Sequence, residues 1–331
     1  MIKQGLTLYS ATNEWVTGKY NLESIVAKVA EAGIGPGVEV VGYQSLRGFP
    51  ELTPGFADWW QNLLARYELV PTCLASNIDV ALRSDRLLTD DEMTESLTRQ
   101  MKVAKELGFG IVRTQIGASP VVLERVAPLA EDWGLKLGME LHAPEGPRTA
   151  AILPVRDLYE RVDSPALGFI PDFSATMREI PTGLLDTLRA AGLEERFIVS
   201  LDEAWKGEGA PFERYGRWAG ATEAAGAPKK AIQAAMLVFT MFGREPIESW
   251  YDIADRIVHV HGKCYGFDEA GDEPSIDYPA LIGILEDIGY DGYISTEWEG
   301  HSYLGPDEAD SFAEVAKQQA LVRRIVGARV G

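Results

Sequence analysis

The feature that most constrains this chain is an alternation of eight short strand-like runs with segments of helical periodicity. The runs are rich in valine, isoleucine and leucine, and they cover residues 5–10, 37–41, 70–75, 110–115, 136–144, 167–172, 257–263 and 293–299. Such alternation is typical of parallel strands joined by crossover helices. We therefore expect an α/β fold of the (β/α)8 TIM-barrel type. A doubly wound sheet is less favoured, because no GxGxxG motif follows the first run.

The helical segments between the runs carry start and stop signals. Asn21 caps a helix that Gly33 closes, and Thr89 precedes three acidic residues, which complement the positive end of a helix dipole. Pro120 opens another helix, and a final helix is expected over about residues 307–325. These signals support one helix after nearly every strand.

One connection is too long to be a single crossover. Residues 173 to about 245 contain a possible extra strand at 197–200, a loop rich in glycine and charge at 206–220, and a helix rich in alanine and methionine at 228–242. We interpret this segment as an insertion on the barrel rim that serves as a lid or a subunit contact. With it, residues 1–331 are expected to form a single barrel domain.

Composition narrows the class of partner. The formal net charge is −19, which argues against nucleic acid and against an anionic membrane surface. The two cysteines, Cys73 and Cys264, are far apart and exclude a disulfide framework or a zinc ribbon. The N-terminus lacks an apolar signal region and no run is long enough to span a bilayer, so we expect a cytoplasmic protein.

Polar residues share one face at the ends of four successive strands. In the strand at 136–142, Gly138, Glu140 and His142 lie opposite Leu137, Met139 and Leu141 when the strand is read with period two. The same reading of the later strands gives an inward face that ends in acidic, imidazole or ammonium groups: Asp172; His259, His261 and Lys263; Glu297 and Glu299. In a parallel barrel these groups meet at the carboxyl-terminal mouth, where active sites lie.

A divalent metal explains this accumulation of carboxylates. Buried carboxylates at this density repel one another unless a positive charge lies among them. Each residue alone could be an ordinary hydrogen-bonded group of the rim. As a set, Glu140, Asp172, His261 and Glu297 predict an oxygen-rich metal site that suits Mn²⁺ best, with Mg²⁺ or Co²⁺ also compatible.

These residues carry a family resemblance that covers nearly the whole chain. The Glu140–His142 pair, Asp172 at its strand end, the segment 259–263 and the late Glu297 resemble the sugar isomerases and epimerases of the xylose-isomerase-like barrel superfamily. The resemblance implies a metal at the four residues named above and proton movement next to a sugar carbonyl. Ala175 and Cys264 depart from the histidine and aspartate of many relatives, which argues against an ordinary ketose epimerase.

A narrower resemblance rests on three segments, residues 5–10, 42–50 and 296–301. They look like the larger subunit of bacterial C-glycoside deglycosidases. This resemblance implies cleavage of the carbon–carbon bond between an oxidised sugar and a flavonoid-type aglycone, and pairing with a smaller β-rich subunit. The alternative is a metal-dependent isomerase or epimerase acting on a ketose, which would use the same metal residues.

The expected chemistry is abstraction of a proton next to a 3-oxo group, followed by expulsion of the aglycone. His142 follows a metal ligand by two residues on the same face, so we expect it to be the general base. Its alternative role is to orient Glu140. Four residues are expected to contact substrate, namely Gln115, Lys263, Glu299 and His301.

Each of these assignments has a simpler alternative. Lys263 could form a structural ion pair, Glu299 and His301 could belong to an exposed loop, and His259 is expected to be a core histidine. A barrel phosphoesterase with several zinc ions is improbable, because the chain has only four histidines. A non-catalytic sugar-binding barrel stays open, since a fold does not fix a function.

Overall fold

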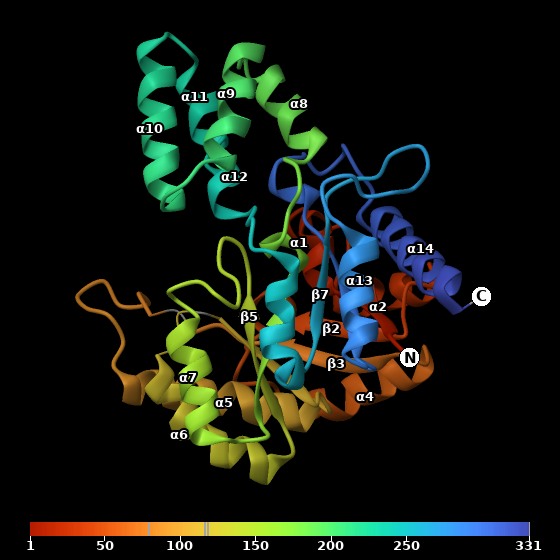
Figure 1. Cartoon of the computed structure of the whole chain (residues 1–331). Helices are drawn as coiled ribbons and strands as arrows, with labels where there is room; N and C mark the ends of the chain where they lie inside the picture. Colours follow the sequence, from red (N-terminus) through yellow and green to blue (C-terminus); the bar gives the residue numbers. More distant parts are fainter. Residues whose placement is uncertain (79, 116, 118, 331) are drawn as a thin grey trace.

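The chain folds into an eight-stranded parallel barrel surrounded by helices (Figure 1). The structure is a computed structural model that describes residues 1–78, 80–115, 117 and 119–330. The strands follow the predicted order and lie close to the predicted positions: β1 (Lys3–Thr7), β2 (Gly37–Val41), β3 (Val70–Ala75), β4 (Ile111–Thr114), β5 (Lys136–Leu141), β6 (Leu167–Pro171), β7 (Val260–Cys264) and β8 (Tyr293–Trp298). The prediction of a (β/α)8 barrel is therefore confirmed.

The strands pair in parallel around the sheet in the order β6-β5-β4-β3-β2-β1-β8-β7. Between β6 and β7 the barrel closes through two isolated parallel bridges, Phe169 with Ile257 and Asp172 with His261. The second bridge places two of the predicted metal ligands side by side at the mouth. Inside the barrel, added β-carbons at Gly138 and Gly168 would clash with Ile170 and Val258, so apolar side chains fill the floor below the mouth.

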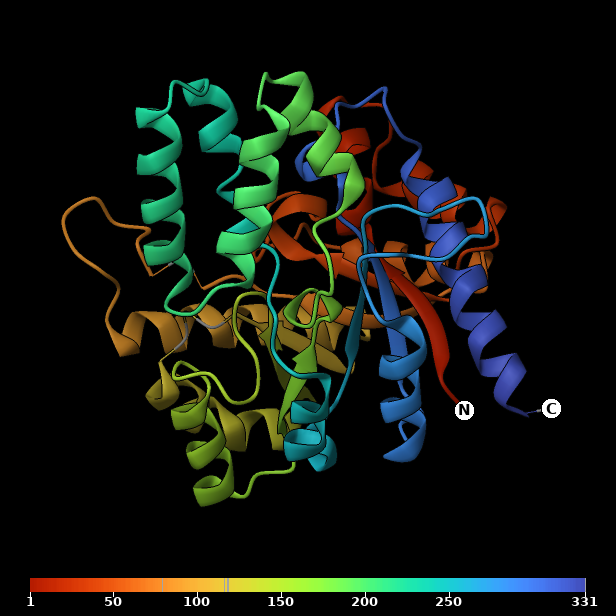
Figure 2. The same ribbon diagram turned by 45° about the horizontal axis from the view of Figure 1, so that its top comes forward.

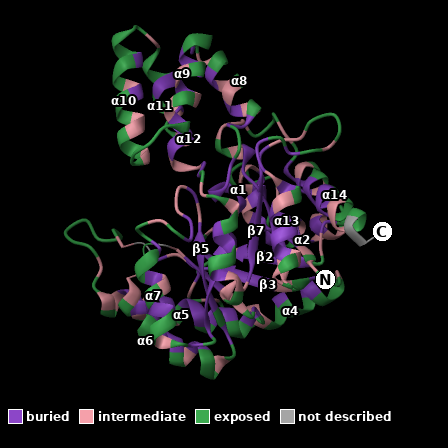
Figure 3. Cartoon of the chain, in the orientation of Figure 1, coloured by how far each residue is buried: buried purple, intermediate pink, exposed green. Residues whose placement is uncertain are grey.

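Helices cover the outside of the barrel with their apolar stripes inward, as the purple and green faces in Figure 3 show. They are α2 (Leu22–Glu31), α4 (Phe56–Arg66), α5 (Asp90–Leu107), α6 (Pro120–Trp133), α7 (Leu153–Val162), η3 (Ile247–Arg256), α13 (Tyr278–Asp287) and α14 (Ser311–Val330). Short rim turns are η1 (Leu8–Ala11), α1 (Thr12–Val16), α3 (Gly42–Ser45), η2 (Phe173–Ala175) and η4 (Gly300–Ser302).

The predicted helix starts agree with the observed caps. Asn21 and Thr89 each form a capping box at the N-terminus of their helix, with Ser24 and Glu92 respectively. The C-terminal helix begins four residues later than predicted, at Ser311, because Asp310 caps it through the backbone amides of Phe312 and Ala313. Within the part of the chain that the structure describes, no helix has both the length and the apolarity needed to cross a membrane.

The segment between β6 and β7 is helical and forms a lobe at one end of the barrel (Figures 1 and 2). Its helices are α8 (Thr182–Ala190), α9 (Glu195–Lys206), α10 (Pro211–Ala224), α11 (Lys229–Ala234) and α12 (Leu237–Thr240). The lobe shares an apolar core with the second half of the barrel, including Phe173, Val260 and Tyr278. It is therefore packed on the barrel and is not a tethered appendage.

The predicted strand at residues 197–200 is wrong, because this segment lies inside helix α9. The buried side chains of α9 are Phe197, Ile198, Leu201 and Trp205, which recur with helical spacing, and the indole of Trp205 donates to the carbonyl of Phe242. Phe197 and Ile198 are only the start of that helical stripe. The single helix predicted over 228–242 is divided into α11 and α12.

Candidate active site

The four predicted metal ligands converge at the mouth of the barrel. Glu140 comes from β5, Asp172 follows β6 directly, His261 lies in β7 and Glu297 in β8. One donor atom from each lies within 4.8 Å of the others. The Nδ1 atom of His261 lies 2.8 Å from Glu140 Oε1, 3.1 Å from Glu297 Oε2 and 3.9 Å from Asp172 Oδ2. The prediction that these four side chains meet at the barrel mouth is therefore confirmed.

The donor set fits a divalent cation. All four residues are buried, and the buried oxygens Asp172 Oδ2 and Glu297 Oε2 have no hydrogen-bond partner among the described residues. The other oxygen of Asp172 is occupied, because Oδ1 accepts from the backbone amide of Ser174 at 2.7 Å. Buried carboxylate oxygens without hydrogen bonds are costly. Lys263 balances part of their charge, and a cation bound by three carboxylates and one imidazole would supply the remaining contacts.

Two buried, positively charged side chains lie beside the candidate ligands. Lys263 has no exposed surface, and its Nζ lies 3.2 Å from Asp172 Oδ2, 3.1 Å from Glu297 Oε2 and 2.9 Å from Glu299 Oε2. On the opposite side, Arg113 Nε lies 3.5 Å from Glu140 Oε2. From the sequence alone, Lys263 has two possible roles, a substrate contact or a structural ion pair. The structure shows the ion pairs, and Lys263 does not line the pocket described below.

This charge arrangement shifts the pKa of the ligands. Burial would raise the pKa of Glu140, but Arg113 and His261 outweigh burial and lower it to about 2. Burial also opposes ionisation of Glu297, yet Lys263 and His261 hold its pKa well below the ordinary value. For Asp172 burial prevails over Lys263 and raises the pKa. At neutral pH at least two ligands are therefore carboxylates that are ready to bind a cation.

His142 follows β5 and opens on the same pocket. Its Nδ1 atom lies 2.7 Å from the carbonyl oxygen of Ala143. A carbonyl can only accept, so Nδ1 carries the proton and the neutral ring has its lone pair on Nε2. None of the described residues forms a hydrogen bond with Nε2. The imidazole is therefore oriented by its own backbone with a basic nitrogen available.

The mouth encloses a pocket of about 390 Å³ that touches two of the ligands. It is lined by Tyr9, Val41, Asn77, Arg113, Gln115, Glu140, His142, Met241, Glu297 and Glu299. The predicted contacts Gln115 and Glu299 belong to this lining, and Glu299 is buried, which excludes the exposed-loop alternative. A larger cavity of about 480 Å³ lies between the loops after β7 and β8, but none of the four ligands lines it.

Three lining residues were not among those predicted for the site. Tyr9 lies in the turn after β1, Asn77 follows β3, and Met241 is the residue directly after α12 of the inserted lobe. The lobe thus contributes a side chain to the pocket wall. Nothing in the local sequence around Met241 distinguishes it from an ordinary core methionine.

His301 lies behind the pocket wall and is not among the lining residues. Its ring contacts Tyr9 edge-on at a centroid distance of 4.9 Å and Trp298 at 5.6 Å. The exposed-loop alternative is also wrong, since the ring is mostly covered. His301 thus contacts the pocket-lining Tyr9 and does not itself line the pocket.

We expect the variant His301→Asn to lower the rate without changing its pH dependence. Burial, with the nearby charge of Lys263, lowers the pKa of His301 to about 4, so the ring is neutral throughout pH 5–8. Loss of its aromatic contacts costs about 0.5–1.5 kcal/mol, or up to about tenfold in kcat/KM. The measurement is the pH profile of turnover for wild type and variant. A limb of the profile that disappears in His301→Asn would contradict this assignment.

Comparison with known proteins identifies relatives of this chain in sequence and in fold. The model of the family described as "xylose isomerase-like TIM barrel" matches residues 26–321. The C-glycoside deglycosidase alpha subunit of Arthrobacter globiformis is 38% identical over 97% of this chain and 89% of its own length. The 3'-dehydrocarminate deglycosidase alpha subunit of a Microbacterium species is 38% identical over 98% of this chain and 95% of its own. Among solved structures, an L-ribulose 3-epimerase superposes with a TM-score of 0.59 at 14% identity, covering 99% of this chain and 95% of that one.

Proposed function

The chain belongs to the xylose isomerase-like TIM barrel family and, within it, to the family of C-glycoside deglycosidase alpha subunits, and on this basis we propose that it is the metal-dependent large subunit of a C-glycoside deglycosidase. The proposed substrate is a 3-oxo-C-glycoside, and the proposed reaction is elimination of its aglycone. The observation that carries the proposal is the shared pocket, which presents metal ligands and the free Nε2 of His142 to the same space.

The proposed cofactor is one divalent cation, most suitably Mn²⁺, held by Glu140, Asp172, His261 and Glu297. When bound, it supplies positive charge that stabilises an oxyanion developing on a ketone oxygen. Lys263 keeps Asp172 and Glu297 in place and balances their charge. We therefore propose Lys263 as a structural counter-charge instead of a substrate contact.

His142 performs the proton transfers in this proposal. Its Nε2 removes the proton from the carbon between the ketone and the anomeric carbon, while the Nδ1–H bond to Ala143 keeps the ring in place. The C–H electron pair enters an enolate. When the enolate collapses, the ketone re-forms, a double bond forms to the anomeric carbon, and the bond to the aglycone breaks. The departing aglycone carbon takes a proton from the imidazolium or from water.

Gln115 and Glu299 are the proposed contacts to sugar hydroxyls. Both line the pocket, and they follow different strands. Gln115 comes directly after β4, and Glu299 comes directly after β8. An amide and a carboxylate between them offer donors and acceptors to a polyol. They can thus orient the sugar ring with its ketone toward the metal ligands and its acidic C–H toward His142.

We propose that the protein acts with a smaller subunit. The relatives in Arthrobacter and Microbacterium are named as alpha subunits, which implies a partner chain for them. The inserted lobe between β6 and β7 is the proposed lid or subunit contact, because Met241 connects its last helix to the pocket wall. A partner that shifts the lobe would change the shape of the pocket near Met241.

The test is product analysis with an oxidised C-glycoside and the Mn²⁺-loaded protein, with and without the presumed small subunit. We expect free aglycone, and we expect EDTA to abolish its release and added Mn²⁺ to restore it. A matched sample with the unoxidised C-glycoside should release none, because no ketone acidifies the C–H bond. Interconversion of a free ketose without any aglycone release would contradict the deglycosidase assignment and favour a metal-dependent epimerase.

A further inference from the structure

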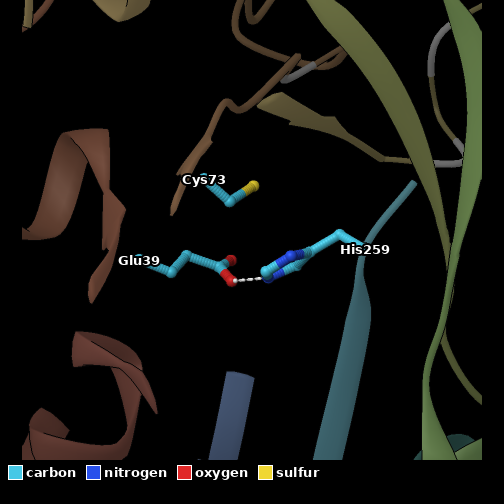
Figure 4. Close-up of side chains that lie close together, drawn as sticks. All are labelled: Glu39, Cys73 and His259. Carbon is cyan, nitrogen blue, oxygen red and sulfur yellow. Dashed lines mark hydrogen bonds and ion pairs between the residues drawn. The ribbon is translucent and has the colours of Figure 1, made fainter. Parts of the chain in front are cut away.

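A second layer of polar side chains lies inside the barrel beneath the metal ligands. Glu39 of β2 is 1% exposed and His259, directly before β7, is fully buried. Figure 4 shows the carboxylate of Glu39 joined to the imidazole of His259, with the thiol of Cys73 nearby. The distance from His259 Nε2 to Glu39 Oε2 is 3.0 Å. A buried carboxylate in the middle of a barrel strand requires an explanation of its own.

Glu39 also contacts the metal ligand His261, on the ring edge that faces away from the other ligands. The Nε2 atom of His261 lies 3.0 Å from Glu39 Oε1 and 3.2 Å from Glu39 Oε2. Its Nδ1 atom faces the carboxylates of Glu140 and Glu297. The imidazole is therefore held between one carboxylate below and the ligand set above.

The position of Glu39 is itself fixed by its neighbours. Its backbone pairs with Thr7 of β1 and Cys73 of β3. His259, which bonds Glu39 from the position directly before β7, has its Nε2 atom 2.9 Å from the hydroxyl of Ser295. Its two oxygens already receive hydrogen bonds from two imidazoles. Because both carboxylate oxygens of Glu39 are already hydrogen-bonded, the arrangement favours a chain of hydrogen bonds through Glu39 over a second metal site that Glu39 would form with Cys73 and His259.

We propose that Glu39 is a positioning residue that fixes the tautomer and the orientation of His261. A carboxylate can only accept, so Nε2 of His261 carries a proton toward Glu39. Nδ1 faces the carboxylate of Glu140, and a cation that replaces the proton on Nδ1 would bind the lone pair of that nitrogen while Glu39 keeps the proton on Nε2. The negative charge of Glu39 also increases the basicity of that lone pair. The inference rests on the proposed function, because it requires that His261 binds the cation.

The first test is the affinity of the full-length protein for Mn²⁺, measured from the EPR signal of free Mn²⁺ during titration. We expect Glu39→Gln to weaken binding by about 10–100-fold, because the neutral amide accepts more weakly. Glu39→Asp should recover part of the loss, since it restores the charge at a shorter reach. The matched control is Glu14→Gln, which alters a buried glutamate bonded to Ser311 on α14 and should leave Mn²⁺ affinity unchanged.

A spectroscopic signature separates positioning from a merely structural role. The chain has four histidines, so ¹⁵N-histidine NMR of the Mg²⁺-loaded protein gives few signals. In wild type we expect the His261 signals of a ring protonated at Nε2 and coordinated at Nδ1, and in Glu39→Gln a shifted or exchange-broadened Nε2–H signal.

The outcomes are distinguishable. Wild type that binds no Mn²⁺ would overturn the proposed function itself. Wild type that binds Mn²⁺ with the same affinity as Glu39→Gln, or a Glu39→Gln variant whose His261 signals match those of wild type, would overturn the role of Glu39 alone. A thermal melt shows whether each variant is folded, and if Glu39→Gln is not, the same comparison is made with Glu39→Asp.

Discussion

Replacing His142 with alanine is expected to lower the rate of aglycone release by about 10²–10⁴-fold, the usual contribution of a positioned general base. The free Nε2 of this ring faces the substrate pocket, and its partner nitrogen is held by Ala143. Because His142 is not a metal ligand in this account, its removal leaves Mn²⁺ affinity unchanged. The measurements are kcat with an oxidised C-glycoside and a Mn²⁺ titration of the same preparation.

The matched control for His142→Ala is His301→Asn, which removes a nearby imidazole outside the pocket wall. It should lose no more than about tenfold in kcat/KM, well below the loss expected for His142→Ala. Added imidazole should partly restore turnover in His142→Ala, since the base is small and the vacated space borders the pocket. If His142→Ala instead loses Mn²⁺ affinity in proportion to its activity, His142 orients Glu140 and another group is the base.

Replacing Lys263 with methionine is expected to destabilise the metal-free protein by about 3–5 kcal/mol, because it leaves buried carboxylates without their counter-charge. Lys263 is fully buried and ion-paired to Asp172, Glu297 and Glu299. Methionine preserves most of the side-chain volume, so the loss of stability would arise from the missing charge and not from a cavity. The measurement is the free energy of unfolding from urea denaturation in EDTA.

The loss in Lys263→Met should become smaller as the pH falls. Burial already raises the pKa of Asp172, and removing Lys263 raises it further, so this carboxyl is protonated first and then needs no counter-charge. Saturating Mn²⁺ should also recover part of the stability. The control is Lys317→Met, which removes a partly exposed lysine paired with Glu314 and should cost no more than about 1 kcal/mol. A loss of similar size in both variants would contradict the structural role of Lys263.

The barrel and the convergence of the four candidate metal ligands could be predicted because both depend on regular strand geometry. Alternation of strands and helices indicates the fold, and period two determines which side chains face inward. Asp172 and His261 are far apart in sequence, yet they pair as neighbours at the closing seam of the barrel. Once the strand ends are known, the meeting of these groups follows from the topology alone.

The same reading could have found Glu39. It lies in an apolar strand with Val38 and Val40 on the opposite face, so period two directs it into the barrel. An ionisable residue in the middle of a barrel strand was the available signal. Its contacts with His259 and His261 depend on the register between β2 and β7, which are not neighbours in the sheet, and that register is not visible in local sequence.

Other parts of the site depend on tertiary packing. Met241 reaches the pocket because the inserted lobe folds back on the barrel, and Tyr9 because the chain turns directly after β1. The wrong strand at residues 197–200 has the same origin, since three apolar residues followed by a serine fit either period and only the longer stripe through Trp205 identifies a helix.

The most direct test of the account follows a deuterium label at the carbon between the ketone and the anomeric carbon of a 3-oxo-C-glycoside. The Mn²⁺-loaded protein is incubated with this substrate and its presumed small subunit, and the sugar product is analysed by mass spectrometry. Elimination through His142 predicts that the sugar product loses the label from that carbon as the aglycone is released. Release of aglycone with the label fully retained in the sugar would contradict proton abstraction at this carbon and, with it, the proposed mechanism.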